Sequence, residues 1–325
     1  MNCYKCPSPL TNRNKTKEHI VPNFLGGKLT SENLICKKCN TEFGETIDAE
    51  LHKQLGFAAE IIVHNRDRKK EDKGILVETI SGKKAKVGLK FLPKPKLYIK
   101  IPGTEKQIEI IGKNEKELRK LALKKKKELE TKYGEFKLTE FVEYPNSEKF
   151  HFKNNSKVQT GIMEFGGTDY FRGIGKIILN FYLTKRPNDK IPKRLMDFVC
   201  GLVNKNQFLF IYHPSHYKIH ELQENEFSHI IYLRGESEIK SIYCYLEIFN
   251  FEKFICIIDD NYTGEDFEET YCLDSLYGKQ IKKEIRIKLY RHNIEDMLFV
   301  TLGHKTQRER AFNEFEKRIE RLQVQ

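Results

Sequence analysis

The stretch Lys17–Asn40, KEHIVPNFLGGKLTSENLICKKCN, holds the most distinctive residues of this 325-residue chain. An acid–His pair, Glu18–His19, stands near its start, and Asn33 comes later in the same stretch. The glycine pair Gly26–Gly27 predicts a turn between two short strands, because glycine tolerates the backbone angles of tight turns. The stretch therefore predicts a hairpin that carries polar residues suited to chemistry.

Two Cys-x2-Cys pairs flank this hairpin, and 29 residues separate them: Cys3, Cys6, Cys36 and Cys39. Two residues between thiolates let both sulfurs reach one ion, and four thiolates at about 2.3 Å form a closed structural Zn²⁺ site. Such a zinc ion would staple a domain that is too small to build a sufficient core. The alternative is four buried or free thiols. The remaining cysteines lie singly in apolar segments and are expected in the core: Cys200, Cys244, Cys256 and Cys272.

A helix is predicted directly after the hairpin. Apolar residues recur every four positions there, as on one buried face of a helix: Phe43, Ile47, Leu51 and Leu55. Asn40 or Thr41 is expected to cap this helix. Asp48 and Glu50 are expected to face solvent. Residues 1–60 thus predict a hairpin followed by a helix, a ββα arrangement.

The length of the chain suggests two or three domains at a prior of about 150 residues each. We predict an α+β fold with boundaries at 1–60, 61–160 and 161–325. No apolar run is long enough for a membrane span of about 18 residues, and the start of the chain has no apolar leader. We therefore expect a cytoplasmic protein, with reduced thiols that are available to a metal.

The positive charge of the chain is concentrated in its middle part. The net charge is +12, and residues 61–160 hold 26 lysines and arginines against 14 acids. A localised basic field is typical of phosphate binding, so this part of the chain is a candidate DNA-binding region. The alternative is an ordinary solvated surface in a lysine-rich protein. The candidate DNA-contacting residues are Lys37, Lys38, Lys124, Lys125, Lys126 and Lys127.

The sequence pattern predicts a basic module of strands and a helix, then a region rich in strands. Strands are expected at 74–80, 83–91, 96–102 and 106–111, followed by a helix at 114–133. Further on, helices are expected within 161–204, strands within 228–276 and an amphipathic helix at 305–323. The role of residues 161–325 stays open among a sensor, a dimerisation element and a site for a partner protein or small ligand.

The order of residues in the first part resembles the zinc-knuckle form of the HNH (ββα-metal) nuclease family. That family has an acid–His pair, a Gly-Gly turn, an Asn-Leu pair, a Cys-x2-Cys knuckle and a His or Asn directly after it. The corresponding residues are Glu18–His19, Gly26–Gly27, Asn33–Leu34, Cys36, Cys39 and Asn40. The resemblance covers about residues 1–56.

The resemblance implies a role for each polar residue of the hairpin. His19 would be the general base that takes a proton from the attacking water, and Asn33 would brace the hairpin and orient His19. Glu18 and Asn40 would hold one divalent cation. The name-giving form of the family has His where this chain has Asn40, and an amide oxygen favours Mg²⁺ or Mn²⁺ over Zn²⁺ at that position.

Two functions remain as hypotheses. The first is a metal-dependent DNA endonuclease with structural zinc, which by analogy with bacterial HNH enzymes of similar layout would serve in restriction or anti-phage defence. The second is a zinc-stapled nucleic-acid-binding module without turnover. The sequence leaves open whether the chain cuts one strand or two, and whether it forms a homodimer.

Overall fold

The chain folds into two compact units with mixed helix and sheet, which confirms the predicted α+β class. The computed structural model describes residues 1–63, 75–78, 84–87, 91–93, 96–100, 104, 107–111, 115–134, 147–152, 161–204, 206–214, 217–224, 226–287, 289–291 and 302–322. The larger unit combines Met1–Asp72 with Thr168–Gln325, and the inserted unit is Lys73–Gly167. Residues 1–60 and most of residues 161–325, which the sequence pattern assigns to separate domains, therefore lie in one unit. A helix of the first region packs on a helix of the second.

The start of the larger unit has the predicted ββα order. Strands β1 (Glu18–His19) and β2 (Thr30–Ser31) pair antiparallel, with the short helix η1 (Asn23–Leu25) between them. Helices α1 (Lys37–Glu45) and α2 (Ile47–Ile62) follow. The four apolar residues of the predicted helix face are buried: Phe43, Ile47, Leu51 and Leu55.

Helix α1 begins earlier than the sequence pattern indicates. Its N-cap is Cys36, so the predicted cap at Asn40 or Thr41 is wrong and Asn40 lies within the first turn. The second cysteine pair is the reason: a three-residue step on a helix places the sulfurs of Cys36 and Cys39 on one side. A break at Thr46, with φ −116° and ψ −95°, then separates α1 from α2.

The predicted turn at Gly26–Gly27 is present and needs glycine at both positions. Gly26 ends η1 with φ +86°, in the left-handed region. A Cβ atom on Gly27 would lie 1.8 Å from the carbonyl oxygen of Val21, so no side chain fits without moving the backbone. The turn therefore sets the return path of the chain from β1 to β2.

We expect Gly27→Ala to lower the free energy of unfolding by about 3 kcal/mol, because the added methyl group forces a backbone shift in a packed site. Gly44→Ala is the matched control: its Cβ would meet nothing within 4 Å, and alanine favours a helix by up to about 1 kcal/mol. Urea unfolding of both variants measures the difference. Equal stability of the two would contradict the close approach at Gly27.

A six-stranded antiparallel sheet forms the body of the larger unit. Its spatial order is β10-β13-β12-β11-β14-β15. The strands are β10 (Leu209–Ile211), β11 (Ser228–Glu236), β12 (Ser241–Ile248), β13 (Glu252–Asp259), β14 (Phe267–Asp274) and β15 (Lys279–Ile281). Every residue of β12 is buried, so this central strand is covered on both faces. Strands β11, β12, β13 and β14 lie in the range 228–276, where the sequence predicts strands. Three of the four singly placed cysteines are buried in the sheet: Cys244, Cys256 and Cys272.

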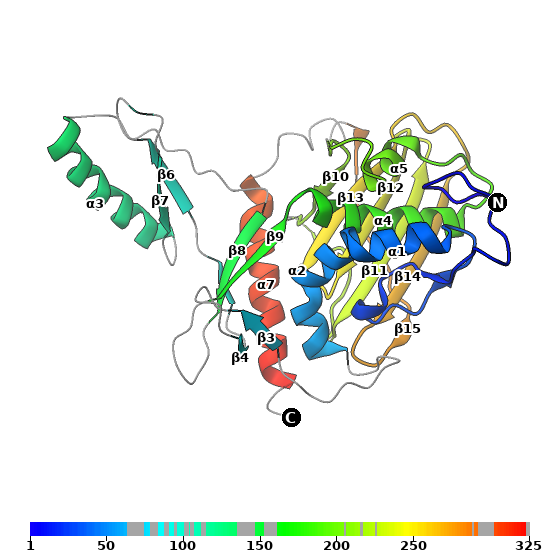
Figure 1. The fold of residues 1–325 in the computed structure, drawn as a ribbon, viewed down its shortest axis with the longest axis horizontal. Helices are drawn as coiled ribbons and strands as arrows, with labels where there is room; N and C mark the ends of the chain where they lie inside the picture. Colours follow the sequence, from blue (N-terminus) through cyan, green and yellow to red (C-terminus); the bar gives the residue numbers. More distant parts are fainter. Residues whose placement is uncertain are drawn as a thin grey trace. The chain divides into compact units, whose positions relative to one another are not determined.

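Helix α4 (Thr168–Lys185) lies between the sheet and the ββα segment. Figure 1 shows α1, α2 and α4 together over one face of the sheet. Tyr170 and Phe171 of α4 pack their rings against Phe254 of β13, both with centroids 6.2 Å apart. The opposite face carries a second cluster of apolar side chains that includes Ile230 and Ile255.

Two further helices complete the larger unit. Helix α5 (Lys193–Val199) packs on α4, and α7 (Leu302–Leu322) contacts β13. Arg308 of α7 binds the buried Glu252 through both carboxylate oxygens at 2.7 and 2.8 Å, and the Tyr170 hydroxyl donates to the same carboxylate at 2.8 Å. None of the described helices has the length and apolarity needed to cross a membrane.

The inserted unit contains the four predicted strands, which pair as two hairpins, and the predicted helix. Strands β3 (Ile75–Glu78) and β4 (Lys84–Val87) form one hairpin, and β6 (Lys96–Lys100) and β7 (Gln107–Ile111) form the other. Helix α3 (Glu115–Tyr133) ends at Gly134 with φ +82°. A third sheet joins β5 (Phe91–Pro93), β8 (Ser147–Phe152) and β9 (Gly161–Gly166), and the sequence pattern does not predict it.

Candidate metal centre and active site

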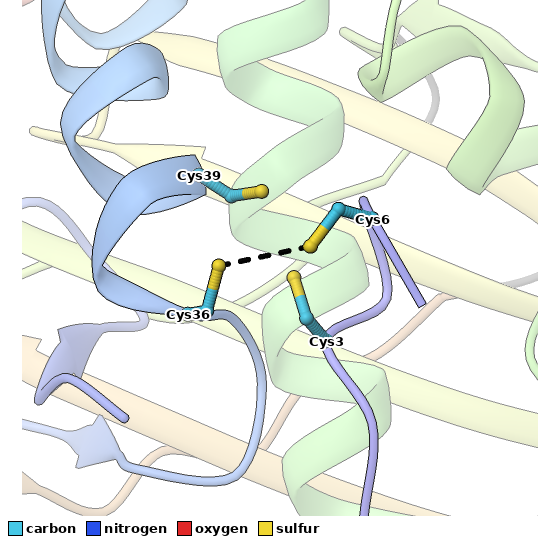
Figure 2. A group of neighbouring side chains, drawn as sticks. All are labelled: Cys3, Cys6, Cys36 and Cys39. Carbon is cyan, nitrogen blue, oxygen red and sulfur yellow. Dashed lines mark hydrogen bonds between the residues drawn. The ribbon is translucent and has the colours of Figure 1, made fainter. Parts of the chain in front are cut away.

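The two cysteine pairs meet at one point, as Figure 2 shows. The sulfurs of Cys3, Cys6, Cys36 and Cys39 all lie within 4.8 Å of one another. The distance between the sulfurs of Cys6 and Cys36 is 3.7 Å. Four sulfurs placed tetrahedrally at about 2.3 Å from a Zn²⁺ ion would be about 3.8 Å apart. The residues present therefore fit the predicted zinc site, and this is the only such cluster in the part of the chain that the structure describes.

Backbone hydrogen bonds hold the two cysteine pairs together. Tyr4 N–H donates to the Leu34 carbonyl at 3.1 Å, just before the second pair. Burial raises the pKa of the Cys3 and Cys39 thiols, whereas hydrogen bonding with Ser8 lowers the pKa of Cys6 to about 6. The lowered pKa makes Cys6 the readiest of these three cysteines to ionise, and metal binding requires the ionised thiolate.

Glu18 of the acid–His pair is buried against α4. Its Oε1 atom lies 2.7 Å from Nζ of Lys176 and accepts a hydrogen bond from Nδ2 of Asn180 at 3.1 Å. The Tyr4 hydroxyl donates to Oδ1 of Asn180 at 3.0 Å. Burial raises the pKa of Glu18, and the charge of Lys176 opposes this shift. Glu18, the predicted metal ligand, therefore belongs to a hydrogen-bond network that extends from Tyr4, between Cys3 and Cys6, to α4.

Lys176 connects α4 to both helices of the ββα segment. Its Nζ lies 2.6 Å from Oδ2 of Asp48 and 5.5 Å from the ring centroid of Phe43. Burial opposes the charge of Lys176, but the carboxylates of Asp48 and Glu18 outweigh burial and raise its pKa. The prediction that Asp48 faces solvent is therefore wrong, because a lysine from another part of the chain binds it.

The other residues of the predicted site lie on the hairpin and on α1. His19 follows Glu18 on β1 and is half-buried. Nδ2 of Asn40 donates to Oγ1 of Thr16 at 3.3 Å, which brings Asn40 to the segment leading into β1. Asn33 is exposed, and its backbone N–H donates to Oγ of Ser31 at 3.3 Å. No hydrogen bond of the Asn33 side chain is found among the described residues.

Glu18 and Asn40 each have one side-chain oxygen that takes part in no hydrogen bond with a described residue. In Glu18 both contacts are made by Oε1, so Oε2 is the oxygen without a hydrogen bond to a described residue. In Asn40 the contact is made by Nδ2, so Oδ1 is the oxygen without such a hydrogen bond. Mg²⁺ and Mn²⁺ prefer one carboxylate or amide oxygen from each of a few ligands and keep several waters. The donor set therefore fits the divalent cation that the resemblance implies.

The predicted DNA-contacting lysines lie on two helices, one in each unit. Lys37 and Lys38 are exposed in the first turn of α1, near Asn40. On α3, Lys125 pairs with Glu128 at 2.7 Å and Lys126 with Glu130 at 3.2 Å. The other two predicted lysines of α3 are Lys124 and Lys127. Both are exposed, and neither has an ion pair among the described residues.

Sequence reasoning missed Lys176, Asn180 and Asp48. The first two stand four residues apart within the apolar run of α4, and both are buried. Buried polar residues in an apolar helix need hydrogen-bond partners. A lysine and an asparagine four residues apart in this apolar run were therefore the signal in the sequence that indicated a buried polar contact. The sequence does not show which partners they have, because Glu18 is more than 150 residues away along the chain.

Residues 3–56 match the sequence model of a family described as HNH endonuclease. Comparison with curated proteins and comparison with solved structures found no match. The family match and the four-cysteine cluster together confirm the predicted resemblance to zinc-knuckle HNH nucleases over this segment. The similarity of residues 3–56 to HNH endonucleases supports nuclease activity, metal binding and a DNA substrate.

Proposed function

We propose that this protein is a metal-dependent DNA endonuclease that hydrolyses phosphodiester bonds. One observation carries the proposal: within the segment that matches HNH endonucleases, Glu18 and Asn40 each keep one oxygen outside the hydrogen bonds of the described chain. Two hard oxygen donors beside a histidine are the set that phosphodiester hydrolysis with Mg²⁺ or Mn²⁺ requires.

In this proposal His19 takes the proton from the attacking water. Histidine is the side chain most suited to that task, because imidazole can accept and release a proton near neutral pH. Glu18 and Asn40 hold the cation, which when bound offsets negative charge on the phosphate and on the leaving oxygen. Asn33 braces the end of the hairpin, and Cys3, Cys6, Cys36 and Cys39 bind a structural zinc ion that fixes the start of α1.

DNA contacts beyond the cut site are proposed for the lysines of α1 and α3. Lys37 and Lys38 lie beside Asn40 at a helix N-terminus, a place that favours phosphate. Lys124 and Lys127 are the strongest candidates on α3, because Lys125 and Lys126 already have acidic partners. Each phosphate that is neutralised should steepen the log–log salt dependence of binding by about 0.9.

The direct test is cleavage of supercoiled plasmid by the purified full chain. We expect nicked or linear product with Mg²⁺ or Mn²⁺ and none with a chelator, since the cation is required for the reaction. Asn40→Ala should lose most of this activity because only one protein ligand remains. DNA binding without cleavage under either ion would instead favour the non-catalytic binding module.

We extend the proposal to a cytoplasmic enzyme of restriction or anti-phage defence. A reducing compartment keeps four thiols available for zinc, which supports the location. The defence role rests on analogy with the layout of bacterial HNH enzymes. Plaque assays on cells that express wild type or His19→Ala test it, and equal plaque numbers in both would count against a defence role that depends on cleavage.

A further inference from the structure

Helix α4 brings two hydrogen-bond donors to a single oxygen of Glu18. Lys176 and Asn180 are four residues apart, so they share one face of α4. Their nitrogens lie 2.7 and 3.1 Å from Oε1, and the two residues are 3% and 0% exposed. Two fixed donors on one oxygen define the orientation of the carboxylate, and therefore the direction in which Oε2 points.

We propose that Lys176 and Asn180 are positioning residues for the catalytic divalent cation. By holding Oε1 of Glu18, they present Oε2 to the cation that Glu18 shares with Asn40. The inference rests on the proposed nuclease function and names residues of that site outside the segment matched to HNH endonucleases. Metal-binding carboxylates are commonly held by such hydrogen bonds, and loss of one partner weakens metal binding about 10- to 100-fold.

Both donors are themselves held in place by residues of the ββα segment. The Tyr4 hydroxyl donates to Oδ1 of Asn180, which leaves Nδ2 facing Glu18. Lys176 is held by Asp48 at 2.6 Å and lies over the ring of Phe43. Neither donor can turn away from Glu18 without breaking a second contact, so the carboxylate is oriented before a cation arrives.

The charges of the network allow a cation to bind beside Lys176. The ionised carboxylates of Glu18 and Asp48 and the ammonium of Lys176 sum to −1. Asp48 thus offsets the lysine, and a divalent cation meets an excess negative charge at Glu18. A lysine without Asp48 would neutralise Glu18 and compete with the cation.

The test compares two variants of the zinc-loaded full chain. Asn180→Leu removes the amide donor, together with the acceptor of the Tyr4 hydroxyl, and keeps the branching and the number of heavy atoms of the side chain. The double variant Lys176→Met with Asp48→Asn removes the other donor and keeps the net charge of the network at −1, so a change in affinity reflects orientation and not charge. Tyr170→Phe is the matched control, because it removes a buried hydrogen bond of the same helix to Glu252, away from Glu18. Melting curves and zinc content verify folding.

Two readouts are measured, Mn²⁺ affinity by electron paramagnetic resonance of the free ion and the Mg²⁺ concentration for half-maximal plasmid cleavage. We expect both test variants to bind Mn²⁺ about 10- to 100-fold more weakly and to need correspondingly more Mg²⁺. Tyr170→Phe should leave both readouts unchanged. A purely structural role predicts lower melting temperatures in all three with wild-type affinity in each, and that result overturns the inference.

Glu18→Gln separates failure of the inference from failure of the proposed function. If wild type cuts DNA, Glu18→Gln does not, and both test variants keep wild-type metal affinity, the inference alone fails. If wild type binds Mn²⁺ through Glu18 but never cuts, the nuclease proposal fails and the affinity comparison still decides the inference. Mn²⁺ affinity that is equal in wild type and Glu18→Gln overturns the inference. Should Asn180→Leu not fold, the double variant decides.

Discussion

Replacing His19 by alanine should lower the rate of plasmid cleavage by about 10²- to 10⁴-fold, the usual contribution of a positioned general base. The loss should appear in the maximal rate, because Glu18 and Asn40 still hold the cation. Single-turnover cleavage at saturating Mg²⁺ measures it. Added imidazole should restore part of the rate, since a small base can occupy the space that the side chain leaves.

His52→Ala is the matched control for His19→Ala. His52 lies on α2 in the same segment and packs its ring against Phe24, with centroids 4.7 Å apart. Its loss removes a histidine that has no proposed role in the reaction. We expect this variant to cut like wild type. Cleavage by His19→Ala at the wild-type rate, with zinc content and melting curve unchanged, would remove His19 from the mechanism.

Replacing Cys36 by serine should remove stoichiometric zinc and unfold the beginning of the chain. Cys36 is both one of the four clustered sulfurs and the N-cap residue of α1, so its loss affects the metal site and the helix start together. Structural zinc contributes folding free energy directly. Hydrogen exchange should rise across residues 1–45, while the central strands β11, β12 and β13 stay protected.

Cys200→Ser is the control for the zinc prediction. Cys200 is a partly buried thiol at the end of α5 in the same unit, and it is not part of the cluster. This variant should keep one zinc ion per chain and wild-type exchange. Full zinc occupancy in Cys36→Ser would contradict the four-cysteine site, and loss of protection over the sheet as well would show that the whole unit unfolds with the metal.

The local order of residues was sufficient to predict three features of the first sixty residues. Spacing alone identified the two cysteine pairs, the turn at Gly26–Gly27 and the buried face of the following helix, and the structure confirms all three. These features depend on neighbours within a few positions or on a ligand with strict geometry, so the sequence expresses them directly. The start of α1 was placed wrongly because Cys36, one of the four clustered cysteines, is also its N-cap residue.

The sequence by itself determined which residues stand together near the start of the chain: an acid, a histidine and an asparagine beside a four-cysteine cluster. Only the tertiary structure decided what surrounds these residues. It joined the first sixty residues to the sheet body in one unit, and it brought Lys176 and Asn180 of α4 onto Glu18. The physical reason is that burying a carboxylate requires donors, and the chain supplies them from a helix that is distant in sequence and packed against the hairpin.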